Sequence, residues 1–148
     1  MSQLVTPYVE IFEERRRQCA DVLAKLLAAP AVDFDGNLRS RLPVSPGLYL
    51  IARKNAPLGE YLHAGQTPRA RKGLRSRVWE QHFTGGGKGA SSDLVQKVID
   101  KGEADSKANA QAWIRANCVV QWLAEPDEDL RCWTEHYVLS MVRPKWGR

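Results

Sequence analysis

The chain has 148 residues and a net charge of +5, with 43% hydrophobic and 26% charged residues. This balance is typical of a folded protein and argues against a disordered one, and the length allows one domain to bury its own core. No run of about 18 apolar residues is present to span a membrane, and the first residues lack the pattern of a signal peptide. We therefore expect a cytoplasmic protein.

The positive charge is concentrated in the middle third of the chain. Residues 47–90 carry eight basic and two acidic residues, whereas residues 1–46 carry six of each and residues 91–148 carry eight and nine. Most of the excess comes from an acid-free run: Arg69, Arg71, Lys72, Arg75 and Arg77. Such a local field attracts polyphosphates, including nucleic acids. A solvated helix face is the alternative interpretation of this charge run.

The N-terminal part predicts one helix followed by a linker. Thr6-Pro7 is typical of a helix start, and apolar residues follow a helical period over residues 7–29. Residues 30–46 are rich in proline and predict a linker. We expect residues 1–44 to pack on the core as an N-terminal helix and linker, and residues 45–148 to form the main domain. The helix is also our candidate for contacts in a homodimer.

Residues 47–53 and 60–67 predict a β-hairpin, because each is a short aliphatic and aromatic run and a turn rich in Asn, Pro and Gly joins them. Tyr49 projects from one face of the first strand, and Tyr61 and His63 share one face of the second. The register stays open: the sequence allows Tyr49 to face His63 directly or one residue displaced.

The second half of the chain predicts helices and a third strand. The glycine-rich residues 84–92 are not a Walker motif, because no Gly-Lys-Ser/Thr opens a helix directly after a strand, and we interpret them as a connector. The expected elements are a helix over about 70–83, a helix from 92 or 93 to 101, a helix over 107–115, a strand over 118–123 and a helix from 126 to 142.

Glu135 interrupts an apolar stripe of the last helix, which it shares with Cys132, Leu139 and Val142. Burying an unpaired carboxylate is costly, so Glu135 requires a basic partner or a metal ion. The pattern alone does not choose between a metal ion and a salt bridge to an arginine such as Arg77.

Four pieces of the chain, in this order, resemble the GIY-YIG nuclease superfamily. The pieces are Gly47-Leu48-Tyr49, His63-Ala64-Gly65, the helix motif Leu74-Arg75-Ser76-Arg77, and Glu135 with Arg143-Pro144 downstream. The resemblance covers roughly residues 45–146. It implies an α+β fold with a small three-stranded antiparallel sheet flanked by helices, to which this chain adds an N-terminal helix. The three strands expected from the residues agree with it.

The resemblance also implies the hydrolysis of a nucleic acid phosphodiester with one divalent metal ion. By this resemblance, Tyr49 orients or deprotonates the attacking water, Arg77 stabilises the phosphate charge and Glu135 binds Mg²⁺ or Mn²⁺. A tyrosine with an ordinary pKa near 10 is a poor base unless a metal ion or an arginine lowers that pKa. We therefore expect the ionisation of Tyr49 to depend on the assembled site.

Three departures from the family pattern stand out. His63 replaces the second signature tyrosine; imidazole can still accept or relay a proton near neutral pH, and Tyr61 is the backup candidate. The ring often found one helical turn after the arginine is displaced, because Gln81 holds that position and His82 is rotated away by about 100°. The asparagine usual after the Arg-Pro segment is absent, and residues 146–148 stand in its place.

These observations predict a metal-dependent endonuclease acting on DNA, with four catalytic residues: Tyr49, His63, Arg77 and Glu135. The expected substrate-binding residues are Arg69, Arg71, Lys72, Arg75, Tyr61 and His82. A catalytically weak or inactive nucleic-acid-binding module of the same fold is the alternative, and a structural domain with Glu135 paired to Arg77 is a third. The carboxylate favours the enzyme, because it repels a phosphate unless a cation lies between them.

Overall fold

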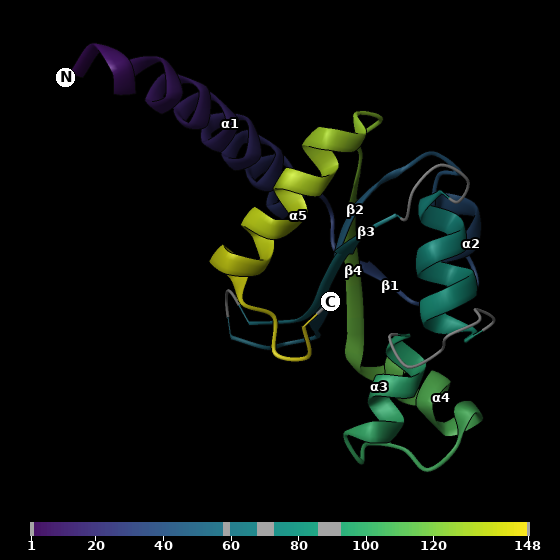
Figure 1. Cartoon of the computed structure of the whole chain (residues 1–148). Helices are drawn as coiled ribbons and strands as arrows, with labels where there is room; N and C mark the ends of the chain where they lie inside the picture. The colour runs from purple at the N-terminus through teal and green to yellow at the C-terminus, as the bar shows by residue number, and fades with distance from the viewer. Residues whose placement is uncertain (1, 58–59, 68–72, 86–92, 148) are drawn as a thin grey trace.

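In the computed structural model, the described residues are 2–57, 60–67, 73–85 and 93–147. They form a mixed α+β fold around one antiparallel sheet with the strand order β1-β4-β2-β3 (Figure 1). The strands are β1 (Val32–Asp33), β2 (Gly47–Arg53), β3 (Tyr61–Gln66) and β4 (Cys118–Ala124). The bounds predicted for β2, β3 and β4 are confirmed to within one residue at each end.

The sequence predicted three strands, but the sheet has four, because the short strand β1 was not predicted. The stretch 30–46, expected as a linker, contains β1, which pairs with β4, and a short helix, α2 (Leu38–Arg41). Four of its apolar side chains are buried in the core: Val32, Phe34, Leu38 and Leu42. Val32 and Phe34 are two residues apart, as on one face of a strand, and Leu38 and Leu42 are four apart, as on one face of a helix. The prolines of the stretch led to the prediction of a linker instead.

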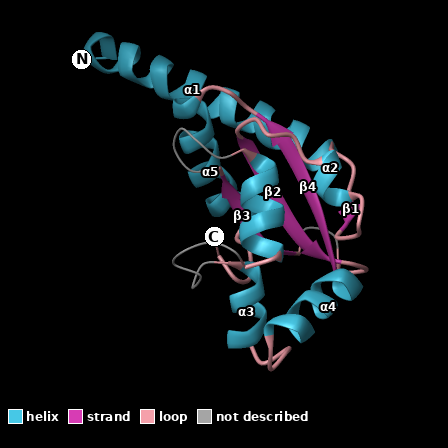
Figure 2. Ribbon diagram, turned by 90° about the vertical axis from the view of Figure 1, so that its right-hand side faces the viewer, coloured by secondary structure: helices cyan, strands magenta, loops and turns pink. Residues whose placement is uncertain are grey.

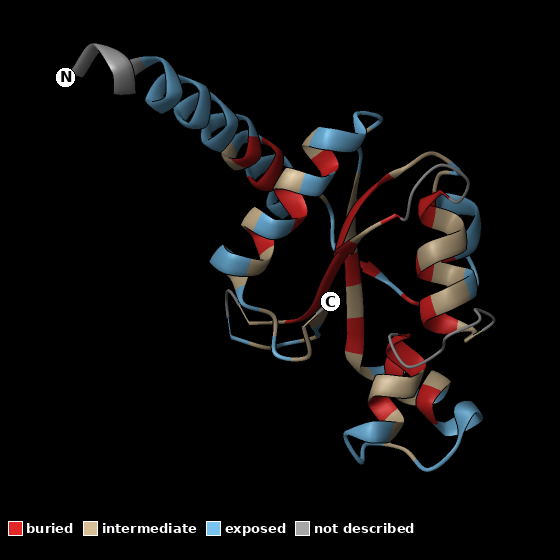
Figure 3. Ribbon diagram, viewed as in Figure 1, coloured by how far each residue is buried: buried red, intermediate tan, exposed pale blue. Residues whose placement is uncertain are grey.

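The N-terminal helix α1 (Ser2–Ala28) begins before Pro7 rather than at it. Pro7 therefore lies inside the helix, where it has no backbone N–H to donate to the preceding turn. The N-terminal half extends away from the rest of the molecule, and its apolar side chains are exposed there: Tyr8, Ile11 and Phe12 (Figure 3). The same stripe becomes buried from Cys19 onward. Pairing of two copies through the exposed part stays a prediction.

Different helices cover the two faces of the sheet (Figure 1). α1 and α5 (Glu128–Val142) pack on the face that carries Leu48, Leu50 and Ala64. The opposite face, seen in Figure 2, carries Tyr49 and Ile51 and lies under the remaining helices: α2, η1 (Arg75–Phe83), α3 (Leu94–Asp100) and α4 (Lys107–Asn117). None of the helices in the described ranges combines the length and apolar character needed to cross a membrane.

Three helices of the second half agree with the sequence, and the fourth differs from the prediction in its start and in its type. α3, α4 and α5 lie where they were predicted, and Asp127 caps α5 by accepting a hydrogen bond from the Leu130 N–H at 2.9 Å. The helix expected over 70–83 is π-helical from Arg75 to Phe83. Three residues of the basic run and most of the glycine-rich connector lie outside the described residues: Arg69, Arg71, Lys72 and residues 86–92.

Candidate active site

Tyr49 lies at the centre of a buried polar cluster on the sheet face covered by η1. Its side chain is only 1% exposed. The Arg77 Nε donates a hydrogen bond to the Tyr49 hydroxyl at 3.1 Å, and the His82 Nε2 lies 2.7 Å from the same oxygen. The Arg77 Nη1 donates to the Gln81 side-chain oxygen at 2.8 Å, which holds the guanidinium in place. Two nitrogen groups thus converge on one phenolic oxygen.

The π-helical geometry of η1 places His82 in this cluster. In a π-helix the backbone bonds join residues five apart, as in the 2.9 Å bond from the Thr84 N–H to the Trp79 carbonyl. The turn is therefore wider than an α-helical turn, and both Gln81 and His82 reach the side of Arg77. The expectation that His82 is rotated away was wrong, because it assumed a period of 3.6 residues.

The strand register decides which residues of β3 join Tyr49. Tyr49 pairs with Gly65, and His63 pairs with Ile51, so His63 lies diagonally from Tyr49 on the same face. The His63 ring is stacked on Tyr49 at a centroid distance of 5.8 Å and meets the His82 ring edge-on at 4.6 Å. His63 is fully buried, and its Nε2 has no hydrogen-bond partner among the described residues.

Gly65 is required for Tyr49 to lie where it does. A Cβ atom at Gly65 would lie 2.5 Å from the Tyr49 hydroxyl oxygen, far inside van der Waals contact. The glycine of the second signature triplet therefore leaves the space that the phenol ring occupies. A larger residue at position 65 would collide with the Tyr49 ring.

Tyr61 does not share the face of His63. The register shifts between Ile51 and Ala52, and this irregularity turns Tyr61 toward the other core, where α1 and α5 pack. Its hydroxyl donates to the Gln121 side chain at 3.4 Å. The expectation of a shared face was therefore wrong, because a bulge breaks the strict alternation along a strand.

Arg75 also points elsewhere in this structure. Its Nε donates to the Leu42 carbonyl at 3.0 Å and thereby fastens η1 to the segment before β2.

Lys97 and the C-terminal segment support His63, and sequence reasoning missed both. The Lys97 Nζ lies 3.0 Å from the His63 Nδ1 and donates to the Trp146 carbonyl at 3.0 Å. The segment in turn follows the free edge of β3, with bonds from Trp146 N–H to the Leu62 carbonyl and from Ala64 N–H to the Gly147 carbonyl. Backbone groups of the C-terminal segment thus brace the cluster.

The ionisable groups of the cluster have shifted pKa values. Burial raises the pKa of Tyr49 to about 12, and the Glu135 and Asp93 charges add to this rise while the nearby Arg77 opposes it. Burial, together with neighbouring positive charges, lowers the pKa values of His63 and His82 well below their ordinary range. Burial and the Arg77 charge lower the pKa of Lys97 to about 8. Both histidines are therefore neutral at pH 7.

Glu135 lies on α5 and contacts Gln66, the last residue of β3. It is 9% exposed, and its Oε1 accepts a hydrogen bond from the Gln66 amide at 3.4 Å. Its negative charge contributes to the rise in the pKa of Tyr49, less than burial does. Arg77 donates to Tyr49 and Gln81. The interpretation as a structural domain stays a prediction.

A divalent ion fits this donor set only with help from water and substrate. Among the described residues, no group of three or more His, Cys, Asp or Glu side chains is arranged to hold a metal ion. Mg²⁺ commonly binds through one or two carboxylates and completes its shell with waters and phosphate oxygens. Glu135 is an oxygen ligand of that kind, so the residues present fit such an ion when a phosphate is bound.

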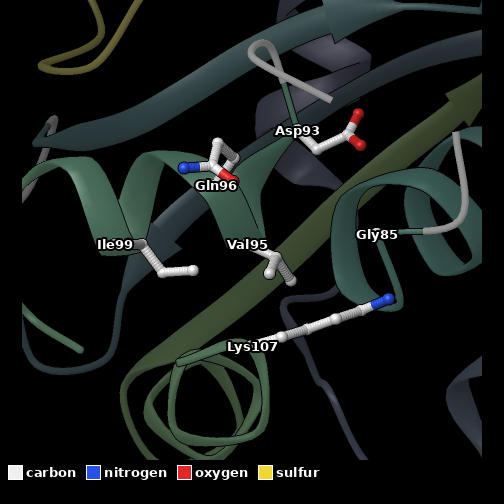
Figure 4. Close-up of a pocket in the computed structure, with 6 residues that line it drawn as sticks. All are labelled: Gly85, Asp93, Val95, Gln96, Ile99 and Lys107. Carbon is white, nitrogen blue, oxygen red and sulfur yellow. The ribbon is translucent and has the colours of Figure 1, made fainter. Parts of the chain in front are cut away.

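Asp93, at the start of α3, is a second buried carboxylate near the cluster. It is 3% exposed, and its Oδ2 has no hydrogen-bond partner in the part of the chain that the structure describes. Burial raises its pKa, while Arg77 and Lys107 oppose the rise. It borders a small pocket of about 70 Å³, whose lining also includes Gly85 and Lys107 (Figure 4). Asp93 is the residue before the first turn of α3, and its side chain makes no capping hydrogen bond.

We compared the chain with family models, with curated proteins and with solved structures, and none of them matches it. The class defined by fold and site together is an α+β protein with a buried Tyr-His-Arg cluster beside a carboxylate. The functional argument therefore depends on the chemistry of this cluster.

Proposed function

We propose that this chain is a divalent-metal-dependent endonuclease that hydrolyses phosphodiester bonds in DNA, with a site of the GIY-YIG type. The observation that carries the proposal is the convergence of the Arg77 Nε and the His82 Nε2 on the Tyr49 oxygen. The Glu135 charge also contributes to the pKa of Tyr49. An oxygen held by fixed N–H donors is suited to exist as a phenolate and to take a proton from an attacking water.

The other residues have separate tasks in this proposal. The Arg77 guanidinium carries a permanent charge and planar donors that match a phosphate, so it stabilises the charge that develops there. Glu135 is the protein ligand of Mg²⁺ or Mn²⁺, which when bound supplies Lewis-acid activation of the phosphate and its leaving oxygen. His63 stacks on Tyr49 and holds the ring in place. A cytoplasmic location and DNA as the substrate stay predictions.

The weak or inactive binding module remains the second candidate, because one observation favours it. Burial raises the pKa of Tyr49 to about 12, which keeps the phenol protonated at neutral pH unless a bound cation lowers that pKa. A protein of this kind would bind nucleic acid with a strong salt dependence and would not cut it.

A cleavage panel tests the proposal. Labelled single-stranded, duplex and branched DNA and matching RNA are incubated with Mg²⁺, Mn²⁺ or EDTA. The wild type is compared with Glu135→Gln, and Asp129→Asn is the control because Asp129 is an exposed carboxylate on the same helix. We expect metal-dependent cutting of DNA that falls at least about 100-fold in Glu135→Gln and is unchanged in Asp129→Asn. Salt-sensitive binding without cutting, equal in all three proteins, would support the binding module instead.

A further inference from the structure

The hydrogen bonds of His82 determine which of its ring nitrogens carries the proton. The Leu94 backbone N–H donates to the His82 Nδ1 at 3.0 Å. A backbone amide can only donate, so Nδ1 is an acceptor and has no proton. His82 is fully buried, and burial lowers its pKa well below the ordinary range, so the ring is neutral. A neutral imidazole has one N–H, which must then be on Nε2.

The Nε2–H of His82 faces the Tyr49 hydroxyl oxygen at 2.7 Å. The contact is therefore a hydrogen bond donated by His82 and accepted by Tyr49. The same oxygen accepts the Arg77 Nε–H at 3.1 Å. A hydroxyl oxygen has two lone pairs, and these two donors occupy both, so the proton of Tyr49 points away from His82 and Arg77.

We propose that His82 is a positioning residue that donates a hydrogen bond to the Tyr49 oxygen and stabilises its phenolate form, and that it does not take the proton of Tyr49. This inference rests on the proposed function. Tyr49 first loses its proton to solvent. The phenolate then takes a proton from the attacking water, whose oxygen bonds to phosphorus as the bond to the leaving oxygen breaks, and the leaving oxygen takes a proton from solvent water. His82 keeps its Nε2 proton throughout.

The start of α3 makes this arrangement stable. Leu94 is the first residue of α3, and the first N–H groups of a helix have no partner inside the helix. Here the His82 ring accepts one of them, so a helix end and the wide turn of η1 together fix the orientation of the ring. For His82 to act as a base toward Tyr49, Nε2 would have to be free of its proton, and that would leave the Leu94 N–H facing a second N–H.

Nitrogen NMR of the wild-type protein tests the inference without any substrate. Long-range ¹H–¹⁵N correlations distinguish a protonated from an unprotonated ring nitrogen, and the loss of signals in His82→Gln assigns them to His82. We expect the proton on Nε2, with Nδ1 as the acceptor, throughout pH 6.5–8. A proton on Nδ1 would overturn the inference, whether or not the protein cleaves DNA.

Two substitutions test the same point in the cleavage reaction. In His82→Gln the side-chain amide can still donate to Tyr49 but cannot take a proton, whereas His82→Leu can do neither. We expect His82→Gln to stay within about 10-fold of the wild type and His82→Leu to lose about 100-fold or more. Equal, large losses in two folded variants would show that His82 acts as a base. If the wild type cuts nothing, the proposed function fails, and the NMR result still decides the position of the proton.

Discussion

Tyr49 and Leu50 are neighbours on β2, yet their side chains lie on opposite faces of the sheet and in different surroundings, one polar and one aliphatic. Leu50 packs in an aliphatic core with α1 and α5. Tyr49 lies among His63, Arg77 and His82. Because side chains alternate along a strand, one short segment supplies both the packing that stabilises the fold and the oxygen of the candidate site. Each face therefore buries a hydrophobic core, and the face of Tyr49 also carries the phenolic oxygen of the candidate site.

The face that carries Tyr49 and His63, the polar face, loses free energy because polar groups are desolvated there. A buried polar atom without a hydrogen bond costs on the order of 1–3 kcal/mol, and the His63 Nε2 is such an atom. The aliphatic face has penalties of the same kind, because α5, which packs on it, buries the Arg131 Nε and the Thr134 Oγ1 without a hydrogen-bond partner among the described residues.

The largest expected effect on stability comes from a cavity in the aliphatic core that contains Leu50. Leu50→Ala removes a side chain that is 1% exposed and should lower the free energy of unfolding by about 2–5 kcal/mol. Urea unfolding measures this change. Cleavage per folded molecule should stay close to that of the wild type, because Leu50 points away from Tyr49. A large loss of cleavage in the folded fraction would show that the two faces are not separable.

A smaller effect is expected from crowding the polar face. In Gly65→Ala the new methyl group would lie 2.5 Å from the Tyr49 oxygen, so the ring must move. We expect a loss of about 1–3 kcal/mol in the free energy of unfolding and about 100-fold in cleavage. Gly36→Ala is the control, because a Cβ there meets no atom within 4 Å and should change neither quantity. Wild-type cleavage by Gly65→Ala would mean that the position of Tyr49 is unimportant.

How much of the fold follows from the sequence differs between its elements. The strands β2, β3 and β4 and the helices α3, α4 and α5 were predictable, because local period, caps and breakers agree there. β1 and α2 were missed, since a two-residue strand has no period and is defined by its partner β4. The predicted start of α1 was wrong, because the sequence does not distinguish a proline at the start of a helix from one inside it.

The candidate site was predictable only in part, for reasons of geometry. Tyr49, His63 and Arg77 are brought together as expected, and the Glu135 charge acts on Tyr49. The bulge that turns Tyr61 away and the π-helix that turns His82 inward both change a period, and neither has a local sequence signature. Lys97 and Asp93 joined the site through tertiary packing, which periodicity does not reveal.

The smallest expected effect is a pH dependence confined to the polar face. Folding lowers the pKa values of His63 and His82, so below about pH 6.5 the unfolded chain takes up protons that the folded chain does not. Stability should therefore fall as the pH drops from 6.5 to 5.5, by up to about 1.4 kcal/mol per histidine and pH unit.

Urea unfolding at the two pH values checks this dependence. His63→Gln should remove the contribution of His63, whereas Leu50→Ala should leave the dependence on pH unchanged. A stability that rises on acidification through this range would contradict neutral histidines at the site.

The most direct test of the account compares two arginines of η1. Arg77 bonds to Tyr49, whereas Arg75 bonds to the Leu42 carbonyl, and replacing either with lysine keeps the charge. Single-turnover cleavage of the best DNA substrate with Mg²⁺ is measured for Arg77→Lys, Arg75→Lys and the wild type, each corrected for its folded fraction. The account predicts that Arg77→Lys is slower by about 100- to 1,000-fold and that Arg75→Lys is close to the wild type. Equal cleavage by all three proteins would contradict the claim that the polar face of the sheet is the site that cuts phosphodiesters.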